Sequence, residues 1–335
     1  MVLIHELGHY TAGKILKFKI DEFSVGFGPK LLQKTRDNGE KISLRAIPLG
    51  GYCAFYGEED VPEKSTVTAE TAIPFNHHAP WKRIIVFAAG AGFNFFSAFI
   101  FSFIYIFAVG YGLPVVNNVF YDGVRPYCEL KSGDIITEVD GNRVGVLSSY
   151  AELMSDKTEG DTVTFTVIRN DNEMQITAVM QKIKADGLDE YVGVGISPKY
   201  EIINYNFGDA ATMSAPFTFK MSWAILGSLG KLVTGQVAPT ELTGPIGTVT
   251  AIAEYSMIDW RYILLFLPLI ASNLAIFNLL PIPALDGLKI IFAGIEAVRK
   301  KPINKKAEYI INVVGMFALF AFVIIIDLVG FILRL

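Results

Sequence analysis

The stretch Ile84–Leu113 reads IIVFAAGAGFNFFSAFIFSFIYIFAVGYGL and contains no Asp, Glu, Lys or Arg. About 20 apolar residues in a helix cross the hydrocarbon core of a bilayer, so this stretch is long enough to span a membrane. Two further uncharged runs follow, Tyr262–Leu285 and Tyr309–Ile326. We therefore predict a multi-pass α-helical membrane protein.

The overall composition predicts a water-soluble part beside these spans. The chain has 335 residues, of which 52% are hydrophobic and 19% are charged. A typical soluble domain is about 25% charged. The shift toward lipid is real, but it is too small for a chain that is membrane from end to end. The net charge of −4 gives no indication of a nucleic-acid partner.

The N-terminal segment Met1–Leu16 is suited to a helix but is too short to cross a bilayer. It has neither the basic start nor the cleavage site of a signal peptide. We expect either that the true start lies upstream or that the first span is incomplete in this chain. With this truncated helix, the expected number of transmembrane helices is about four.

Charge predicts the side on which each connecting segment lies. Residues 14–83 carry about 11 Lys and Arg against about 9 acids, and residues 286–308 carry about 6 against about 3. Residues 114–261 carry about 11 against about 19. Because short loops rich in Lys and Arg stay in the cytoplasm, the loop Arg299–Lys306 is predicted inside. Each full span crosses to the other side, which places residues 114–261 outside and residues 14–83 inside.

The outer segment begins with strand signals. Asp134–Asp140 and Thr162–Ile168 mix alternation with short apolar runs, and Asp140–Asn142 is typical of a turn. Tyr150–Ser155 is expected to form a short helix. Asn204–Gln236 is apolar at helical spacing, which predicts an amphipathic helix on the membrane surface.

A β-hairpin is predicted between the first helix and the first full span. Lys41–Ala46 alternates in period two, and Asp37–Gly39 before it is a strong hairpin turn. Glycines cluster at Gly26, Gly28 and Gly50. We expect a small antiparallel unit next to the first helix.

His5-Glu6-Leu7-Gly8-His9 fits the pattern H-E-x-x-H. On a helix, residues four apart lie on one face, so both imidazoles are placed to bind one Zn²⁺. Glu6 lies beside the metal as the general base. Ionisable side chains at membrane depth are costly, and a bound metal supplies their partner.

Such a zinc site needs a third protein ligand and one open position. Asp286 is the best candidate, because it ends an uncharged run broken by Pro281 and Pro283. Irregular backbone at this depth is tolerated where it is buried in protein or lines a wet cavity. The alternative is that Asp286 marks the cytoplasmic end of the span.

Two amides precede Asp286 in the same run. Asn273 and Asn278 are candidates to hold an unwound substrate strand or the oxyanion. The alternative for both is hydrogen bonding between helices.

The paired motifs H-E-x-x-H and N-x-x-P-x-P-x-L-D-G resemble those of the bacterial site-2 protease family of intramembrane zinc metalloproteases. Phe23–Gly28 and Ile47–Tyr52 resemble that family's membrane-associated hairpin region. Ala89–Asn94 resembles its G-P-x-x-N element, and Leu130–Gly141 resembles the core of a PDZ domain. The similarity covers nearly the whole chain.

The resemblance implies a reaction and its residues. His5, His9 and Asp286 would bind one Zn²⁺ per chain, with Glu6 as the base. The substrate would be a transmembrane segment of a single-span protein, such as an anti-sigma factor already cut by an upstream site-1 protease, or a signal-peptide remnant. Residues implied in substrate binding are Asn278, Asn273, Asn94, Gly26 and Gly28.

The resemblance also implies a domain order and a location. The protein would lie in the bacterial inner membrane, with the active site toward the cytoplasm and one extracytoplasmic PDZ domain. The expected parts are a truncated first span at 1–18, a hairpin region at 19–60, spans at 82–113, 261–287 and 307–333, the PDZ domain at 115–200 and an amphipathic linker at 204–250.

The sequence departs from the family's pattern at several points. Ala91 stands where proline is usual, and Leu288 replaces a second glycine after Gly287. Two other functions compete with the protease: a membrane-anchored PDZ scaffold with an inactive metal site, and a transporter with a metal in its pathway. The intact Glu6 argues against the scaffold, and the hairpin and PDZ domain fit a transporter poorly.

Overall fold

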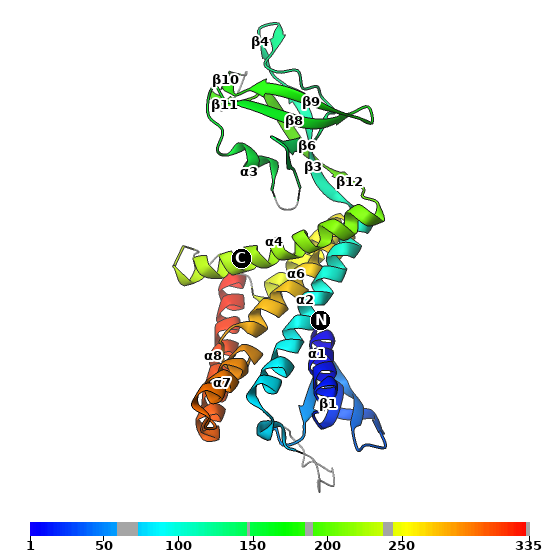
Figure 1. Ribbon diagram of the computed structural model, residues 1–335, viewed down its shortest axis with the longest axis vertical. Helices are drawn as coiled ribbons and strands as arrows, with labels where there is room; N and C mark the ends of the chain where they lie inside the picture. The colour runs from blue at the N-terminus through cyan, green and yellow to red at the C-terminus, as the bar shows by residue number, and fades with distance from the viewer. Residues whose placement is uncertain (59–72, 146–147, 185–189, 237–243, 333–335) are drawn as a thin grey trace. The chain divides into compact units, whose positions relative to one another are not determined.

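The structure is a computed structural model, which describes residues 1–58, 73–145, 148–184, 190–236 and 244–332. The chain divides into two compact units (Figure 1). The membrane unit comprises Met1–Phe101 and Met221–Leu335, and the sheet unit comprises Ser102–Lys220.

In the part of the chain that is described, three helices are long and apolar enough to cross a membrane. They are α2 (Pro80–Val109), α6 (Tyr262–Leu279) and residues 306–330 of α8 (Lys305–Ile332). Helix α1 (Val2–Ile15) has 14 residues. It is too short to span, so the expected count of about four is not confirmed beyond these three.

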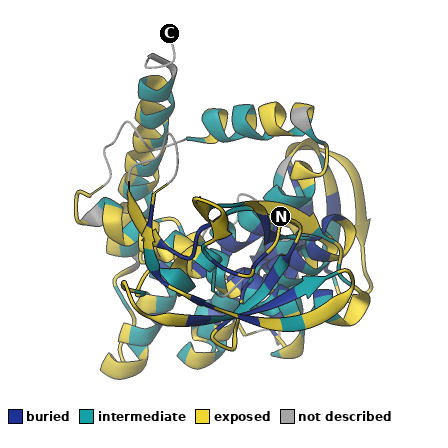
Figure 2. Cartoon of the chain, turned by 90° about the horizontal axis from the view of Figure 1, so that it is seen from above, coloured by how far each residue is buried: buried dark blue, intermediate teal, exposed yellow. Residues whose placement is uncertain are grey.

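Helix α8 illustrates why these helices suit lipid. No residue in its apolar window is buried (Figure 2). Phe317, Phe320 and Ile324 are among the large side chains that it exposes. A helix that presents apolar side chains to its surroundings in this way is stable in hydrocarbon and unfavourable in water.

Two helices end earlier than the predicted spans. Helix α2 ends at Val109, because Gly110 adopts a left-handed φ of +93° and strand β3 begins at Tyr111. Helix α6 ends at Leu279 rather than at 287. Its next residue, Leu280, is extended ahead of Pro281, and a residue before proline is disfavoured in the helical region.

The predicted hairpin is present as β1 (Ile20–Thr35) and β2 (Lys41–Phe55). Gly39 in its turn has a φ of +83°, the conformation that glycine adopts at little cost. The first part of β1 pairs on both sides, because Phe23 faces Cys53 on one side and Ile42 on the other. Residues 51–55 therefore form an outer strand of this small sheet.

A buried carboxylate ties the hairpin turn to α1. Glu40 accepts a hydrogen bond of 2.8 Å from the hydroxyl of Tyr10 and forms an ion pair with Lys14. Burial by itself raises the pKa of the Glu40 carboxyl. Hydrogen bonds from Lys14, Tyr10 and Asn38 outweigh burial and hold that pKa below its usual value. The turn is thus fixed against the helix that carries the H-E-x-x-H pattern.

The sheet unit is built on an antiparallel sheet of order β12-β3-β6-β8-β9, with β7 paired to β6. Its strands are β3 (Tyr111–Val119), β6 (Ile135–Val139), β7 (Asn142–Arg143), β8 (Thr162–Arg169), β9 (Asn172–Val179) and β12 (Ile196–Ile203). Two small ribbons add β4 (Tyr121–Asp122) with β5 (Arg125–Pro126), and β10 (Gln181–Ile183) with β11 (Tyr191–Gly193).

The sheet encloses an apolar core of fully buried side chains, among them Ile136, Val163 and Phe165. Helix α3 (Tyr150–Met154) packs its apolar side chains on this core. The strands and the short helix expected from the sequence are therefore present. Whether the unit is a PDZ domain stays a prediction.

The remaining helices are one short 3-10 helix before α2 and three helices in the second half of the chain. They are η1 (Phe75–His77), α4 (Phe207–Val233), α5 (Pro245–Ile258) and α7 (Asp286–Arg299). The helix expected over 204–236 is α4, which has residues in both units and exposes Phe219, Trp223 and Leu226.

Asp327, an acid near the C-terminal end of the last span, caps another helix. Its Oδ1 and Oδ2 accept hydrogen bonds of 3.2 and 3.4 Å from the backbone N–H of Ile246, in the first turn of α5. Pro245 has no N–H, and a Cβ on Gly244 would lie 2.3 Å from Oδ1 of Asp327. The positive end of α5 thereby stabilises the carboxylate of Asp327 within an otherwise apolar part of α8.

Replacing Asp327 by Ala removes this cap. We expect Asp327→Ala to lower the free energy of unfolding by about 1 kcal/mol, the usual value of a lost cap. Asp327→Asn retains an acceptor oxygen and should lose much less. Thermal unfolding in detergent measures both, with Glu254→Ala on the exposed face of α5 as the control. Equal stability of Asp327→Ala and the parent would contradict the capping role.

Candidate metal centre

Three side chains from the two ends of the chain meet at one point. His5 and His9 lie one turn apart on α1, and Asp286 is the first residue of α7. The two Nε2 atoms are 3.1 Å apart, and Oδ2 of Asp286 lies 3.0 Å from Nε2 of His5 and 3.3 Å from Nε2 of His9. Among the described residues, this is the group of His, Cys, Asp and Glu whose geometry suits a metal ion.

The donor set fits such an ion. The three ligand atoms lie within 4.8 Å of one another. Oδ2 of Asp286 is buried and accepts no well-oriented hydrogen bond from the described residues. A buried carboxylate oxygen without a donor is unfavourable unless a cation satisfies it. Two imidazole nitrogens and one carboxylate oxygen are ligands that zinc takes in catalytic sites.

A backbone carbonyl fixes the ring of His9. Its Nδ1 donates a hydrogen bond of 2.8 Å to the carbonyl oxygen of Val86 on α2. The proton is therefore on Nδ1, and Nε2 is free to face the site. The ring cannot rotate without leaving a buried N–H unpaired.

Glycines allow α1 and α2 to approach closely enough for this contact. A Cβ on Gly8 would lie 2.3 Å from the carbonyl oxygen of Ala89. A Cβ on Gly90 would lie 2.5 Å from Nε2 of His9 and 2.7 Å from Cε1 of His5. The space in front of the two imidazoles therefore exists because residue 90 has no side chain.

Glu6 stands between the histidines in sequence and contacts the hairpin. Its Oε2 accepts a hydrogen bond of 3.1 Å from the backbone N–H of Cys53 on β2. Cys53 lies in the outer strand of the hairpin sheet, which thereby orients the carboxylate. Glu6, the three candidate ligands and Tyr52–Phe55 all line one cavity of about 410 Å³.

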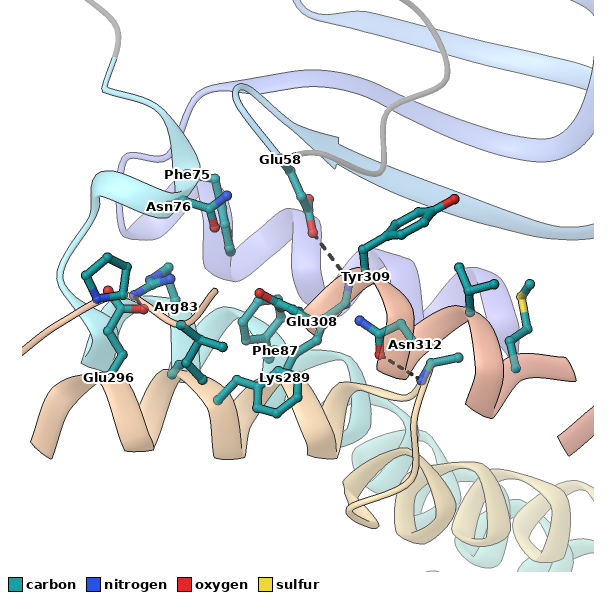
Figure 3. Close-up of a pocket in the computed structure, with 17 residues that line it drawn as sticks. Glu58, Phe75, Asn76, Arg83, Phe87, Lys289, Glu296, Glu308, Tyr309 and Asn312 are labelled. Carbon is teal, nitrogen blue, oxygen red and sulfur yellow. Dashed lines mark hydrogen bonds and ion pairs between the residues drawn. The ribbon is translucent and has the colours of Figure 1, made fainter. Parts of the chain in front are cut away.

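The turn that carries Asp286 is held by α8. Ala284 adopts a left-handed φ of +70°, and its N–H donates a hydrogen bond of 3.1 Å to Oδ1 of Asn312 (Figure 3). A Cβ on Gly315 would overlap Pro283, with 2.0 Å between the two Cβ atoms. A left-handed alanine is costly, so α8 contributes to the position of the metal ligand.

A second cavity of about 370 Å³ adjoins the first (Figure 3). Glu58, Phe87, Ala284 and Lys289 line both cavities. Nζ of Lys289 lies 3.4 Å from Oε1 of Glu58 and 5.5 Å from the centre of the Phe87 ring. This ion pair therefore stands where the two cavities meet.

The structure brings some of the predicted site residues together and separates others. His5, Glu6, His9, Asp286 and Asn278 line the same cavity. Four predicted substrate-binding residues are not among its described lining residues: Gly26, Gly28, Asn94 and Asn273.

Gly26 and Gly28 lie instead where β1 bends, with φ of +87° and +81°. Asn94 is fully buried in α2, and its amide has no hydrogen-bond partner in the described residues.

Sequence reasoning missed the contacts made by Val86, Gly90, Cys53 and Asn312. Two of these contacts are made by backbone atoms, which have no residue preference to detect. Gly90 is visible in the sequence as one glycine of a span, but only its neighbours show why it is needed.

An H-E-x-x-H helix brought against a distant carboxylate, in a chain with three described helices apolar enough to cross a membrane, is typical of the membrane metallopeptidases. The sequence model described as Peptidase family M50 matches residues 1–322. The chain therefore belongs to Peptidase family M50, which confirms the predicted site-2 protease family and the predicted class of enzyme.

Relatives of similar length support this assignment. A protein of Fusobacterium nucleatum is 31% identical over 98% of this chain and 94% of its own length. A protein of Mesorhizobium japonicum is 30% identical over 91% and 88%, and one of Agrobacterium fabrum is 28% identical over 94% and 88%. All three are provisionally named zinc metalloproteases.

Gly90→Ala tests the geometry of the centre. The added methyl would collide with both imidazoles, so we expect metal affinity to fall about tenfold or more, the scale at which displaced ligands lose metal. Gly92→Ala is the matched control, since its Cβ would meet nothing within 4 Å. Competition with a chelator measures Zn²⁺ affinity. Equal affinities for the two variants would show that residue 90 does not border the site.

Proposed function

We propose that this chain is a zinc endopeptidase that cleaves transmembrane segments of single-span proteins. His5, His9 and Asp286 bind one Zn²⁺, and Glu6 is the general base. The observation that carries the proposal is the convergence of the three ligand atoms within 4.8 Å, beside a glutamate on the same helix. Membership of Peptidase family M50 and the zinc metalloprotease names of the relatives support it.

Two nitrogens and one oxygen leave a zinc ion with an open fourth position. When bound, the ion would polarise the scissile carbonyl and lower the pKa of water at that position toward about 7. The protein's part is to hold the three ligands rigidly. Val86 does this for His9, and the turn held by Asn312 does it for Asp286.

Glu6 is placed to transfer a proton from the attacking water to the leaving group. One of its oxygens, Oε2, is occupied by the N–H of Cys53. The other oxygen is left to take a proton from the attacking water. The same carboxyl then delivers this proton to the amine of the leaving peptide, as a general base that becomes a general acid.

The hairpin offers a way to unwind the substrate. A helical segment shields its peptide bonds, so it must become extended before cleavage. Residues 51–55 form an outer strand, and the N–H of Cys53 points from this strand to Glu6. We propose that the substrate adds to this edge as a further strand, which places its backbone beside the base.

Other residues are proposed to shape or contact the substrate. Gly26 and Gly28 bend β1 and place Phe27, which lines the cavity. The unsatisfied amide of Asn94 and the amide of Asn273 are proposed to meet the unwound segment within the membrane.

The remaining parts of the proposal concern location and selection. The protein is proposed to lie in the bacterial inner membrane, with the centre toward the cytoplasm, as the basic loop Arg299–Lys306 favours. The sheet unit is proposed to be an extracytoplasmic PDZ domain that filters substrates by size. Substrates would be anti-sigma factors trimmed by a site-1 protease, or signal-peptide remnants.

Glu6→Gln should remove the base and keep the metal. We expect cleavage of a membrane-spanning substrate in detergent to slow by roughly 100- to 10,000-fold, the usual contribution of general acid–base catalysis. Metal analysis should still find zinc, because Glu6 is not a ligand. Cleavage at the parent rate would exclude Glu6 as the base.

Asp286→Ala should remove the third ligand. We expect this variant to lose both zinc and cleavage, whereas Glu296→Ala, farther along the same helix, should keep zinc. Zinc content after dialysis against a weak chelator is the measurement. Full zinc occupancy in Asp286→Ala would rule out the proposed ligand set.

A further inference from the structure

The amide of Asn278 contacts a candidate metal ligand. Asn278 lies near the C-terminal end of α6, and its Nδ2 is 3.3 Å from Nδ1 of His5. This nitrogen is on the side of the ring away from Nε2, which faces Asp286 and His9. Asn278 therefore touches the back of a ligand as well as lining the cavity.

The position of the proton on the His5 ring determines whether the Asn278 amide donates or accepts this hydrogen bond. On the proposed function, Nε2 of His5 binds the metal, so the single proton of the neutral ring is on Nδ1. An N–H at that position needs an acceptor. The two ends of a carboxamide have nearly the same size and shape, so a half-turn of the Asn278 amide places Oδ1 where Nδ2 stands.

We propose, on the basis of the proposed function, that Asn278 is a positioning residue: its Oδ1 accepts the Nδ1–H of His5 and holds the ring for metal binding. The ring of His9 is held in the same way, because the carbonyl oxygen of Val86 accepts its Nδ1–H at 2.8 Å. Each histidine of α1 is thus anchored by a different membrane helix, His9 by α2 and His5 by α6. Such partners fix both the tautomer and the orientation of a metal-bound imidazole.

This role differs from that of a substrate-binding amide. A residue that only contacts the substrate affects binding or turnover and leaves metal affinity unchanged. A residue that orients His5 sets the metal affinity even when no substrate is present. Zn²⁺ affinity therefore separates the two roles without any assay of cleavage.

The test measures Zn²⁺ affinity of the full chain in detergent by competition with a chelator. We expect Asn278→Leu, which has similar size and no acceptor, to bind Zn²⁺ 10- to 100-fold more weakly, as is usual when the partner of a metal-bound histidine is lost. Asn278→Asp keeps an acceptor oxygen at the same place and should retain near-parent affinity. Rescue by aspartate and loss by leucine together would support the positioning role.

Asn273→Leu is the matched control. Asn273 lies on the same helix and has no hydrogen bond to the described residues, so its replacement should leave Zn²⁺ affinity unchanged. The absorption spectrum of bound Co²⁺ provides a second measurement, because it reports ligand geometry. It should change in Asn278→Leu and remain as in the parent in Asn278→Asp and Asn273→Leu.

Two results would overturn the inference. One is an Asn278→Leu variant that binds Zn²⁺ as tightly as the parent, which would assign Asn278 to the substrate alone. The other is an Asn278→Asp variant that loses Zn²⁺ to the same extent as Asn278→Leu. Failure of the parent chain itself to bind Zn²⁺ is a different outcome, because it would overturn the proposed function and with it the reason for a protonated Nδ1.

Discussion

The membrane unit depends on one constraint: the largely buried side chains of His5, His9 and Asp286 must hold their donor atoms within 4.8 Å of one another. Groups of this kind are costly in an apolar setting unless a cation satisfies them. Helices α1 and α2 meet this constraint by packing closely against each other. A missing side chain at Gly90 leaves the space, and the carbonyl oxygen of Val86 fixes one ring.

Asp286, the proposed third ligand, follows an interruption in the helical chain. Pro281 follows the last turn of α6, and the chain then turns through a left-handed Ala284 before α7 begins at Asp286. Such a turn is tolerated at this depth because α8 packs on it and Asn312 satisfies its free N–H. Irregular backbone, which lipid alone would not permit, thereby becomes a rigid support for the proposed metal ligand Asp286.

The hairpin is proposed to connect the candidate centre to a substrate. Its turn is fixed to α1 through Glu40, and its outer strand reaches Glu6 through the N–H of Cys53. The strand that is proposed to bind the substrate backbone is therefore the strand that orients the proposed base. The proposed substrate-binding strand and the proposed base therefore lie at the same edge of the hairpin sheet. An extended peptide paired at that edge would lie beside the carboxylate of Glu6.

The sequence by itself determined the features that depend on neighbours along the chain. Uncharged runs predicted α2, α6 and α8, the spacing of His5 and His9 placed them on one face, and Asp37–Gly39 predicted the hairpin turn. Periodicity, turn residues and motif spacing are local properties, so they can be read without a structure. The sequence could predict Asp286 as a ligand only because the residues around it form a local motif.

The tertiary structure alone decided the contacts between distant segments. It placed the N–H of Cys53 on Glu6 and the amide of Asn278 behind His5, neither of which the motifs predicted. It also gave Asp327 a partner at the start of α5. These contacts depend on how helices cross and on backbone atoms that every residue possesses, so no residue pattern records them.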